Sequence, residues 1–72
     1  MVKVETQRDP RRGILAIAFE ASRPEDLDVL DEVRTAMLGE FEKTGGYVGS
    51  NRFVLHIKVS DAEAAMWAEA GV

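Results

Sequence analysis

The sequence predicts a single α+β domain whose secondary-structure elements follow in the order ββαβα. Three observations support this fold class. Polar and apolar residues alternate over residues 2–7 and again over 52–59, as they do in half-buried strands. Apolar residues recur at helical spacing between residues 23 and 44. The chain has 72 residues, of which 46% are hydrophobic and 31% charged, which suffices for one core but not for two.

Residues 2–20 have the pattern of a β-hairpin. The alternating residues 2–7 form its first strand, and Pro10 and Gly13 provide the conformations that a turn requires. Residues 14–20 are apolar on both faces, which predicts a central strand covered on both sides.

A long helix is predicted over residues 23–44. Ser22 and Glu25 have the spacing of a capping box, and Gly45 is a typical residue just beyond a helix C-terminus. The apolar positions of the helix form one stripe, which we expect to cover one face of the sheet. The stripe consists of Leu27, Leu30, Val33, Met37, Leu38 and Phe41.

The rest of the chain is predicted to form a loop over residues 47–51, a strand over 52–59 and a short helix over 61–70. Ser60 and Glu63 have the spacing of a second capping box. With a right-handed crossover, the third strand would run parallel to the second, giving a three-stranded mixed sheet. The short C-terminal helix would then cover the second sheet face or contact a second subunit.

Charge is distributed unevenly along the chain, whose net charge is −4. Residues 23–43 hold three basic and seven acidic residues, so this segment alone contributes 3 − 7 = −4. A helix with carboxylates at successive turns could bind a basic protein surface, and the alternative is an ordinary solvated face. The candidate partner-binding residues of this helix are Glu25, Asp28, Asp31, Glu32 and Glu42.

Trp67 is a further candidate for partner binding. It follows Met66 in an alanine-rich helix, where small residues allow close approach and the indole fills a pocket. The same pattern fits a core residue or a hot spot at an interface, because Trp is enriched at such hot spots.

The alternative function is binding of an anionic ligand, a nucleotide or RNA. Arg34 falls near the middle of the apolar stripe, where an unpaired guanidinium would be costly. It must therefore reach solvent, pair with a carboxylate such as Glu5 or Glu20, or bind an anion. Net acidity and the shortage of exposed aromatic residues disfavour nucleic acid. The candidate anion-binding residues are Arg34, Arg52, Arg11, Arg12 and Tyr47.

Catalytic groups are scarce in the sequence. His56, the one histidine, has no serine or carboxylate near it in a recognisable catalytic grouping, and we expect it on an outward strand face. The glycines at 45, 46 and 49 follow a helix instead of preceding one, so they lack the context of a phosphate-binding loop. We predict no enzymatic activity, no cofactor and no metal site.

Size and composition favour a small acidic protein-binding module. The absence of cysteine fits a cytoplasmic location, and the longest apolar run, Ile14–Phe19, is far below the ~20 residues of a membrane span. A core of this size gains only about 3–5 kcal/mol, which favours a homodimer. An inhibitor or accessory protein of phage or mobile-element origin would have these properties.

Overall fold

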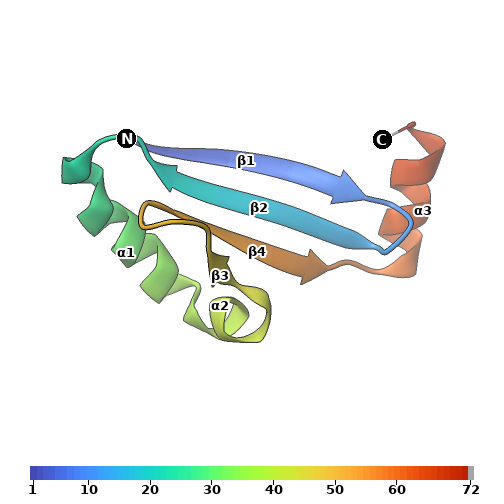
Figure 1. Ribbon diagram of the computed structural model, residues 1–72. Coiled ribbons are helices and arrows are strands. Elements are labelled where there is room, and N and C mark those ends of the chain that lie inside the picture. Colours follow the sequence, from blue (N-terminus) through green and yellow to red (C-terminus); the bar gives the residue numbers. More distant parts are fainter. Residues whose placement is uncertain (72) are drawn as a thin grey trace.

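The computed structural model describes residues 1–71 and has an α+β fold, as predicted (Figure 1). Its four strands form one antiparallel sheet in the order β1-β2-β4-β3. The elements in chain order are β1 (Val2–Asp9), β2 (Ile14–Ala21), the 3-10 helix η1 (Pro24–Asp26), α1 (Leu27–Ala36), α2 (Leu38–Thr44), β3 (Gly46–Tyr47), β4 (Arg52–Lys58) and α3 (Asp61–Glu69).

Strands β1 and β2 form a hairpin in which all eight residues of each strand are paired, from Val2 opposite Ala21 to Asp9 opposite Ile14. Gly13 closes the turn with a φ of +64°, a conformation that residues with a Cβ rarely adopt. The Asp9 carboxylate accepts hydrogen bonds from the backbone N–H and the Nε of Arg12. Strand β2 is central, with β1 on one side and β4 on the other.

The predicted single helix over residues 23–44 is wrong, because the chain bends at Met37 and forms α1 and α2. Met37 has φ −110° and ψ 25°, which turns the next peptide away from the helical direction. Gly39 follows two residues later and weakens helix formation there. The expected capping box at Ser22 is also absent, because Pro24 begins a 3-10 turn with no side-chain cap. The second box is present in part, since Ser60 Oγ accepts a hydrogen bond from Glu63 N at 3.2 Å.

The predicted three-stranded mixed sheet is also wrong, because residues 46–47 form a fourth strand. Gly46 pairs with Val54 and Tyr47 with Phe53, so β3 and β4 are the two arms of a hairpin. The turn between them includes Gly49 at φ +76°. This extra reversal makes β4 antiparallel to β2, whereas a plain loop would have led into a parallel strand.

The core lies between one face of the sheet and helices α1 and α2. Phe53 and Leu55 of β4 are fully buried, and Leu30 of α1 is 2% exposed. The Phe53 ring stacks on Phe19 at 5.0 Å and meets the edge of Phe41 at 5.6 Å. These contacts attach α1, α2 and the two central strands to one hydrophobic cluster.

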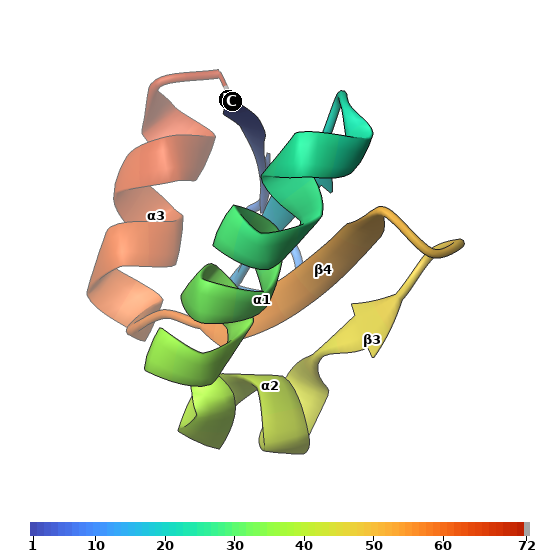
Figure 2. The same ribbon diagram turned by 90° about the vertical axis from the view of Figure 1, so that its left-hand side faces the viewer.

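The helices occupy the two ends of the sheet and leave part of it uncovered. Helices α1 and α2 lie at one end, and α3 lies at the other beside the β1–β2 turn (Figures 1 and 2). On the opposite sheet face, Ala16, Ala18 and His56 line shallow depressions that no residue of α1 or α2 borders. Strand β2 is therefore covered by helices on one face only, contrary to the expectation that both would be covered.

We predict that Leu55→Ala will unfold most of the protein at ordinary temperature. Removing a fully buried leucine typically lowers the free energy of unfolding by about 2–5 kcal/mol, which is comparable to the total for a domain of this size. Urea titration followed by Trp67 fluorescence measures the change. Met66→Ala is the control, because Met66 is 67% exposed. Equal stability of the two variants would contradict this description of the core.

Candidate functional site

The outer surface of α1 carries an acidic ridge, defined here as Asp28, Asp31 and Glu32. All three residues are exposed, and their helical spacing places them on the side away from the buried Leu30. Glu25 lies just before them in η1 and is also exposed. Glu42 is exposed on α2, beyond the bend at Met37, and is therefore not part of the same helix surface.

Two of the three carboxylates in the ridge are not neutralised by the protein itself. Asp31 forms an ion pair with Arg34 Nη2 at 3.0 Å, and Glu25 pairs with Arg23 at 3.4 Å. Within residues 1–71, neither Asp28 nor Glu32 forms an ion pair with a basic group. The two carboxylates lie one helical turn apart on α1. Like charges at this spacing lower the stability of a helix by a few tenths of a kcal/mol. Asp28 lies in the first turn of α1, where the helix dipole favours a carboxylate, whereas Glu32 lies beyond that turn and gains no such stabilisation.

Exposed apolar side chains accompany the acidic ridge. Leu27 is 40% exposed and lies four residues before Asp31, and Val29 is 43% exposed and lies three residues before Glu32, so each borders a carboxylate of the ridge. The expected stripe is thus only partly buried, because Leu30 belongs to the core whereas Leu27 is 40% and Leu38 is 41% exposed. Leu38 is exposed because it follows the bend at Met37 and therefore does not continue the helix that positions Leu30. Carboxylates on such a surface can steer a group of opposite charge toward it, and the exposed apolar side chains can add contact area.

Arg34 lies at the flank of the helix and not in the middle of a buried stripe. Its side chain is 27% exposed, pairs with Asp31 and lies over the Phe41 ring at 5.6 Å. The hydrogen bonds that Arg34 donates to the Asp31 carboxylate raise the pKa of Arg34. Its ion-pair partner is therefore Asp31 and not Glu5 or Glu20, and its guanidinium is already engaged by a carboxylate.

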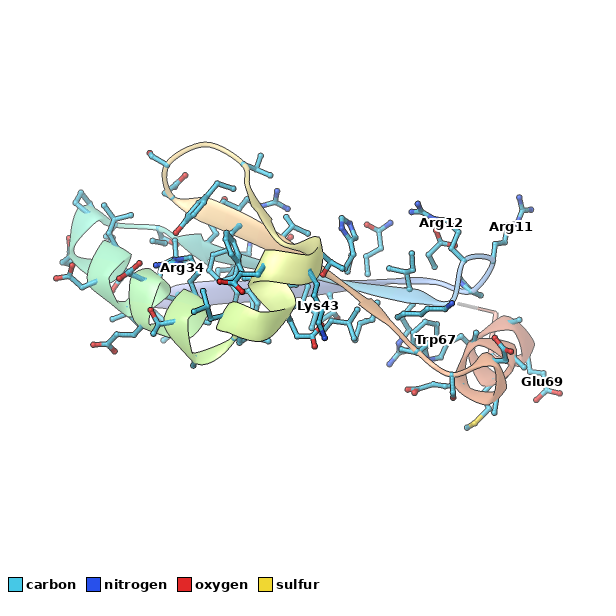
Figure 3. All side chains as sticks on the ribbon, turned by 90° about the horizontal axis from the view of Figure 1, so that it is seen from below. Arg11, Arg12, Arg34, Lys43, Trp67 and Glu69 are labelled. Atoms are coloured by element: carbon cyan, nitrogen blue, oxygen red, sulfur yellow. The ribbon has the colours of Figure 1, made fainter. Side chains whose placement is uncertain are left out.

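The candidate anion-binding residues do not converge. Arg11 and Arg12 lie at the β1–β2 turn, whereas Arg34 lies near the other end of the molecule (Figure 3). Arg52 begins β4, opposite Glu20, at the end of the sheet away from that turn. Tyr47 lies in the aromatic cluster beside Phe41, with ring centroids 5.6 Å apart. The five residues therefore lie in three separate places. Arg11 and Arg12 lie at the β1–β2 turn, Arg34 and Tyr47 lie against the Phe41 ring, and Arg52 lies at the start of β4.

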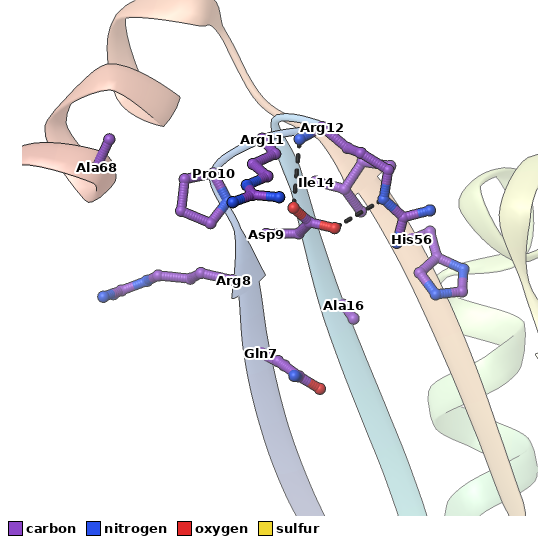
Figure 4. A pocket seen from close by; sticks show the side chains of 10 residues that line it. All are labelled: Gln7, Arg8, Asp9, Pro10, Arg11, Arg12, Ile14, Ala16, His56 and Ala68. Carbon is purple, nitrogen blue, oxygen red and sulfur yellow. Dashed lines mark hydrogen bonds and ion pairs between the residues drawn. The ribbon is translucent and has the colours of Figure 1, made fainter. Parts of the chain in front are cut away.

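The β1–β2 turn borders a shallow depression of about 550 Å³ (Figure 4). Arg11, Arg12 and the exposed His56 line it, together with Gln7. Arg12 already donates from Nε to Asp9 at 2.7 Å, and this bond lowers the pKa of Asp9. Among the residues that the structure describes, no cluster of three or more His, Cys, Asp or Glu side chains could hold a metal ion.

Trp67 is a buried residue of this chain. It is only 7% exposed, and the guanidinium of Arg8 lies 5.6 Å from its ring. Helix α3 therefore docks on its own subunit at the end of β1, which leaves little of the indole accessible to a partner. The neighbouring Met66, at 67% exposed, points away from this contact.

Asp26 is a charged residue that sequence reasoning missed. Its side chain is 9% exposed, and it pairs with Arg23 Nε at 3.2 Å and with the amino group of Met1. The bond from the amino group and the bond from Arg23 lower the pKa of Asp26. No sequence pattern marks this aspartate as buried, because its pairing with the Met1 amino group forms only when the start of the chain meets η1.

No family model, curated protein or solved structure matches the chain. None of the described helices is both long enough and apolar enough to cross a membrane. The candidate site therefore rests on the chemistry and placement of the residues themselves.

We predict that Asp26 makes the protein sensitive to acid. Its pKa is lower in the folded state than its ordinary value near 3.8, so the ionised carboxylate stabilises the fold above that value. This stabilisation is lost as the pH falls through the folded-state pKa. Urea titrations of the wild type and of Asp26→Asn should differ most at pH 5–7 and converge toward pH 2. A difference that is constant with pH would contradict this role.

Proposed function

We propose that the protein is a small, non-enzymatic protein-binding module that acts by occupying a basic surface of a partner. The observation that carries this proposal is the pair of unneutralised carboxylates, Asp28 and Glu32, on the outer side of α1. Paired carboxylates at one-turn spacing attract basic side chains, and the adjacent exposed Leu27 and Val29 add apolar contact. Such complementarity favours fast and specific association.

The partner-binding surface that we propose is the acidic ridge together with Glu25. Glu42 is a peripheral member, because α2 is set at an angle to α1. Trp67 is left out, since its burial against Arg8 gives it a structural role. We further propose that the protein is a cytoplasmic homodimer and an inhibitor or accessory protein of phage or mobile-element origin.

A second candidate function is binding of an anionic ligand at the β1–β2 turn. The observation that favours it is the depression shared by Arg11, Arg12 and His56 (Figure 4). Arg34, Arg52 and Tyr47 lie too far away to contribute. Because Asp9 already engages Arg12, this site offers an anion less positive charge than the sequence suggests.

We predict that Asp28→Lys/Glu32→Lys will abolish capture of the partner. The wild type, this variant and a control are immobilised in parallel, and proteins retained from the native host are identified by mass spectrometry. The control is Glu63→Lys/Glu69→Lys on α3, which changes net charge equally. The proposal expects proteins that bind the wild type and the control but not the ridge variant. Equal loss with both variants would indicate a general charge effect and contradict it.

The anion-binding alternative makes the opposite prediction. Arg11→Glu/Arg12→Glu should leave capture by the acidic ridge unchanged, and it should abolish any binding of a fluorescent RNA oligonucleotide by the wild type. Binding through these arginines would also weaken steeply as salt increases. Retention of the oligonucleotide by the wild type, with loss of it in this variant, would favour the second function over the first.

A further inference from the structure

Strand β1 leaves one edge of the sheet unpaired. It is the outermost strand, and within the part of the chain that the structure describes only β2 bonds to it. Its eight residues present a long edge at the top of the sheet (Figure 1). Exposed edges of this length pair readily with another strand unless they are covered or blocked.

Hydrogen bonds at the two ends of β2 determine which backbone groups of β1 point outward. Ala21 N donates to Asn51 O, and Val59 N donates to Gly13 O, so the odd-numbered residues of β2 bond to β4. The even-numbered residues of β2 then bond to β1, because the direction alternates along a strand. Their partners in β1 are odd-numbered. The outward N–H and C=O groups of β1 therefore belong to Val2, Val4, Thr6 and Arg8.

We propose that two copies of this chain associate through β1, antiparallel and in the register that places Val4 opposite Val4 of the second copy. This inference rests on the proposed homodimer and specifies its interface. The four strands of each copy would form one continuous sheet of 4 + 4 = 8 strands. Pairing about Val4 satisfies the outward backbone groups of Val2, Val4 and Thr6 in both copies.

Charge complementarity selects this register. Lys3 and Glu5 point to the open sheet face, where they form an exposed ion pair at 2.9 Å. In the register centred on Val4, Lys3 of each copy lies directly opposite Glu5 of the other, so charges alternate around a group of four. The smallest shift that keeps the hydrogen-bonding pattern slides one copy by two residues. Such a shift places Lys3 opposite Lys3 in one direction and Glu5 opposite Glu5 in the other. Like charges directly opposite each other destabilise a strand pair.

Exposed apolar groups on the other side of the edge support the same interface. Val4 is 55% exposed although it lies opposite Phe19 of the core. Met1 is 86% exposed, and its amino group pairs with Asp26 at the start of α1. The register centred on Val4 brings the two copies of Val4 together and removes apolar surface from water.

A cysteine cross-link tests the register directly, because the chain contains no cysteine. Cα atoms of a hydrogen-bonded antiparallel pair are about 5.5 Å apart, within the range that a disulfide spans. Val4→Cys should therefore form a covalent dimer under mild oxidation. Thr6→Cys is the matched control on the same edge and face. Its two copies would lie four residues apart, roughly 13 Å, and should not cross-link.

Charge exchange provides a second, non-covalent test. Lys3→Glu and Glu5→Lys should each raise the dimer dissociation constant about tenfold or more in analytical ultracentrifugation. An equimolar mixture of the two variants, or the double variant Lys3→Glu/Glu5→Lys, should restore dimerisation. In the mixture, each chain still carries like charges at its own positions 3 and 5. Recovery of dimerisation in the mixture can therefore come only from contacts between the two chains.

The outcomes separate the interface from the homodimer itself. Light scattering of the wild type should give twice the monomer mass of 8.0 kDa. A mass of 8.0 kDa at high concentration would contradict both the homodimer and this interface. A wild-type dimer whose Val4→Cys variant stays monomeric on non-reducing gels, or cross-links no more than Thr6→Cys, would contradict the interface alone.

Discussion

The packing of Phe53 against Phe19 and Phe41 is the contact on which the rest of the structure depends. It joins the two central strands to the helix layer, and it requires the chain to bend at Met37 so that α2 reaches β4. Because this one cluster is the main core of a short chain, helices α1 and α2 gather over it at one end of the sheet. The open sheet face, the outer edge of β1 and the outer side of α1 consequently remain exposed.

These exposed surfaces differ in chemistry, which is why we assign them different roles. The outer side of α1 is acidic with apolar neighbours, and we propose that it binds a basic partner. The edge of β1 has alternating opposite charges, and we propose that it pairs with a second copy of itself. The turn that carries Arg11 and Arg12 is the most basic region, but Asp9 neutralises part of it. Two copies joined at β1 would present two acidic ridges to a partner, which would increase the apparent affinity.

The sequence predicts the α+β class, because the alternation over residues 52–58 and the helical spacing around Leu30 are local patterns. It does not reveal β3, since two strand residues are too few to show a period, although Gly49 between Val48 and Arg52 is compatible with a hairpin turn. Exposure of the acidic carboxylates follows from helical spacing. The ion pairs of Arg34 with Asp31 and of Arg23 with Asp26 are local, because each joins residues three apart in the sequence. The burial of Trp67 beside Arg8 and the pairing of Asp26 with the Met1 amino group depend on tertiary contacts. Composition alone cannot supply them.

Labelling of carboxylates with a carbodiimide, with and without the captured partner, tests most directly whether the protein acts through its acidic ridge. Mass spectrometry of the digested protein gives the extent of modification at each Asp and Glu. We expect the partner to protect Asp28 and Glu32, while Glu63 and Glu69 on α3 stay as reactive as in the free protein. Unchanged modification of Asp28 and Glu32 in the complex would show that the partner binds elsewhere and would contradict the proposed function.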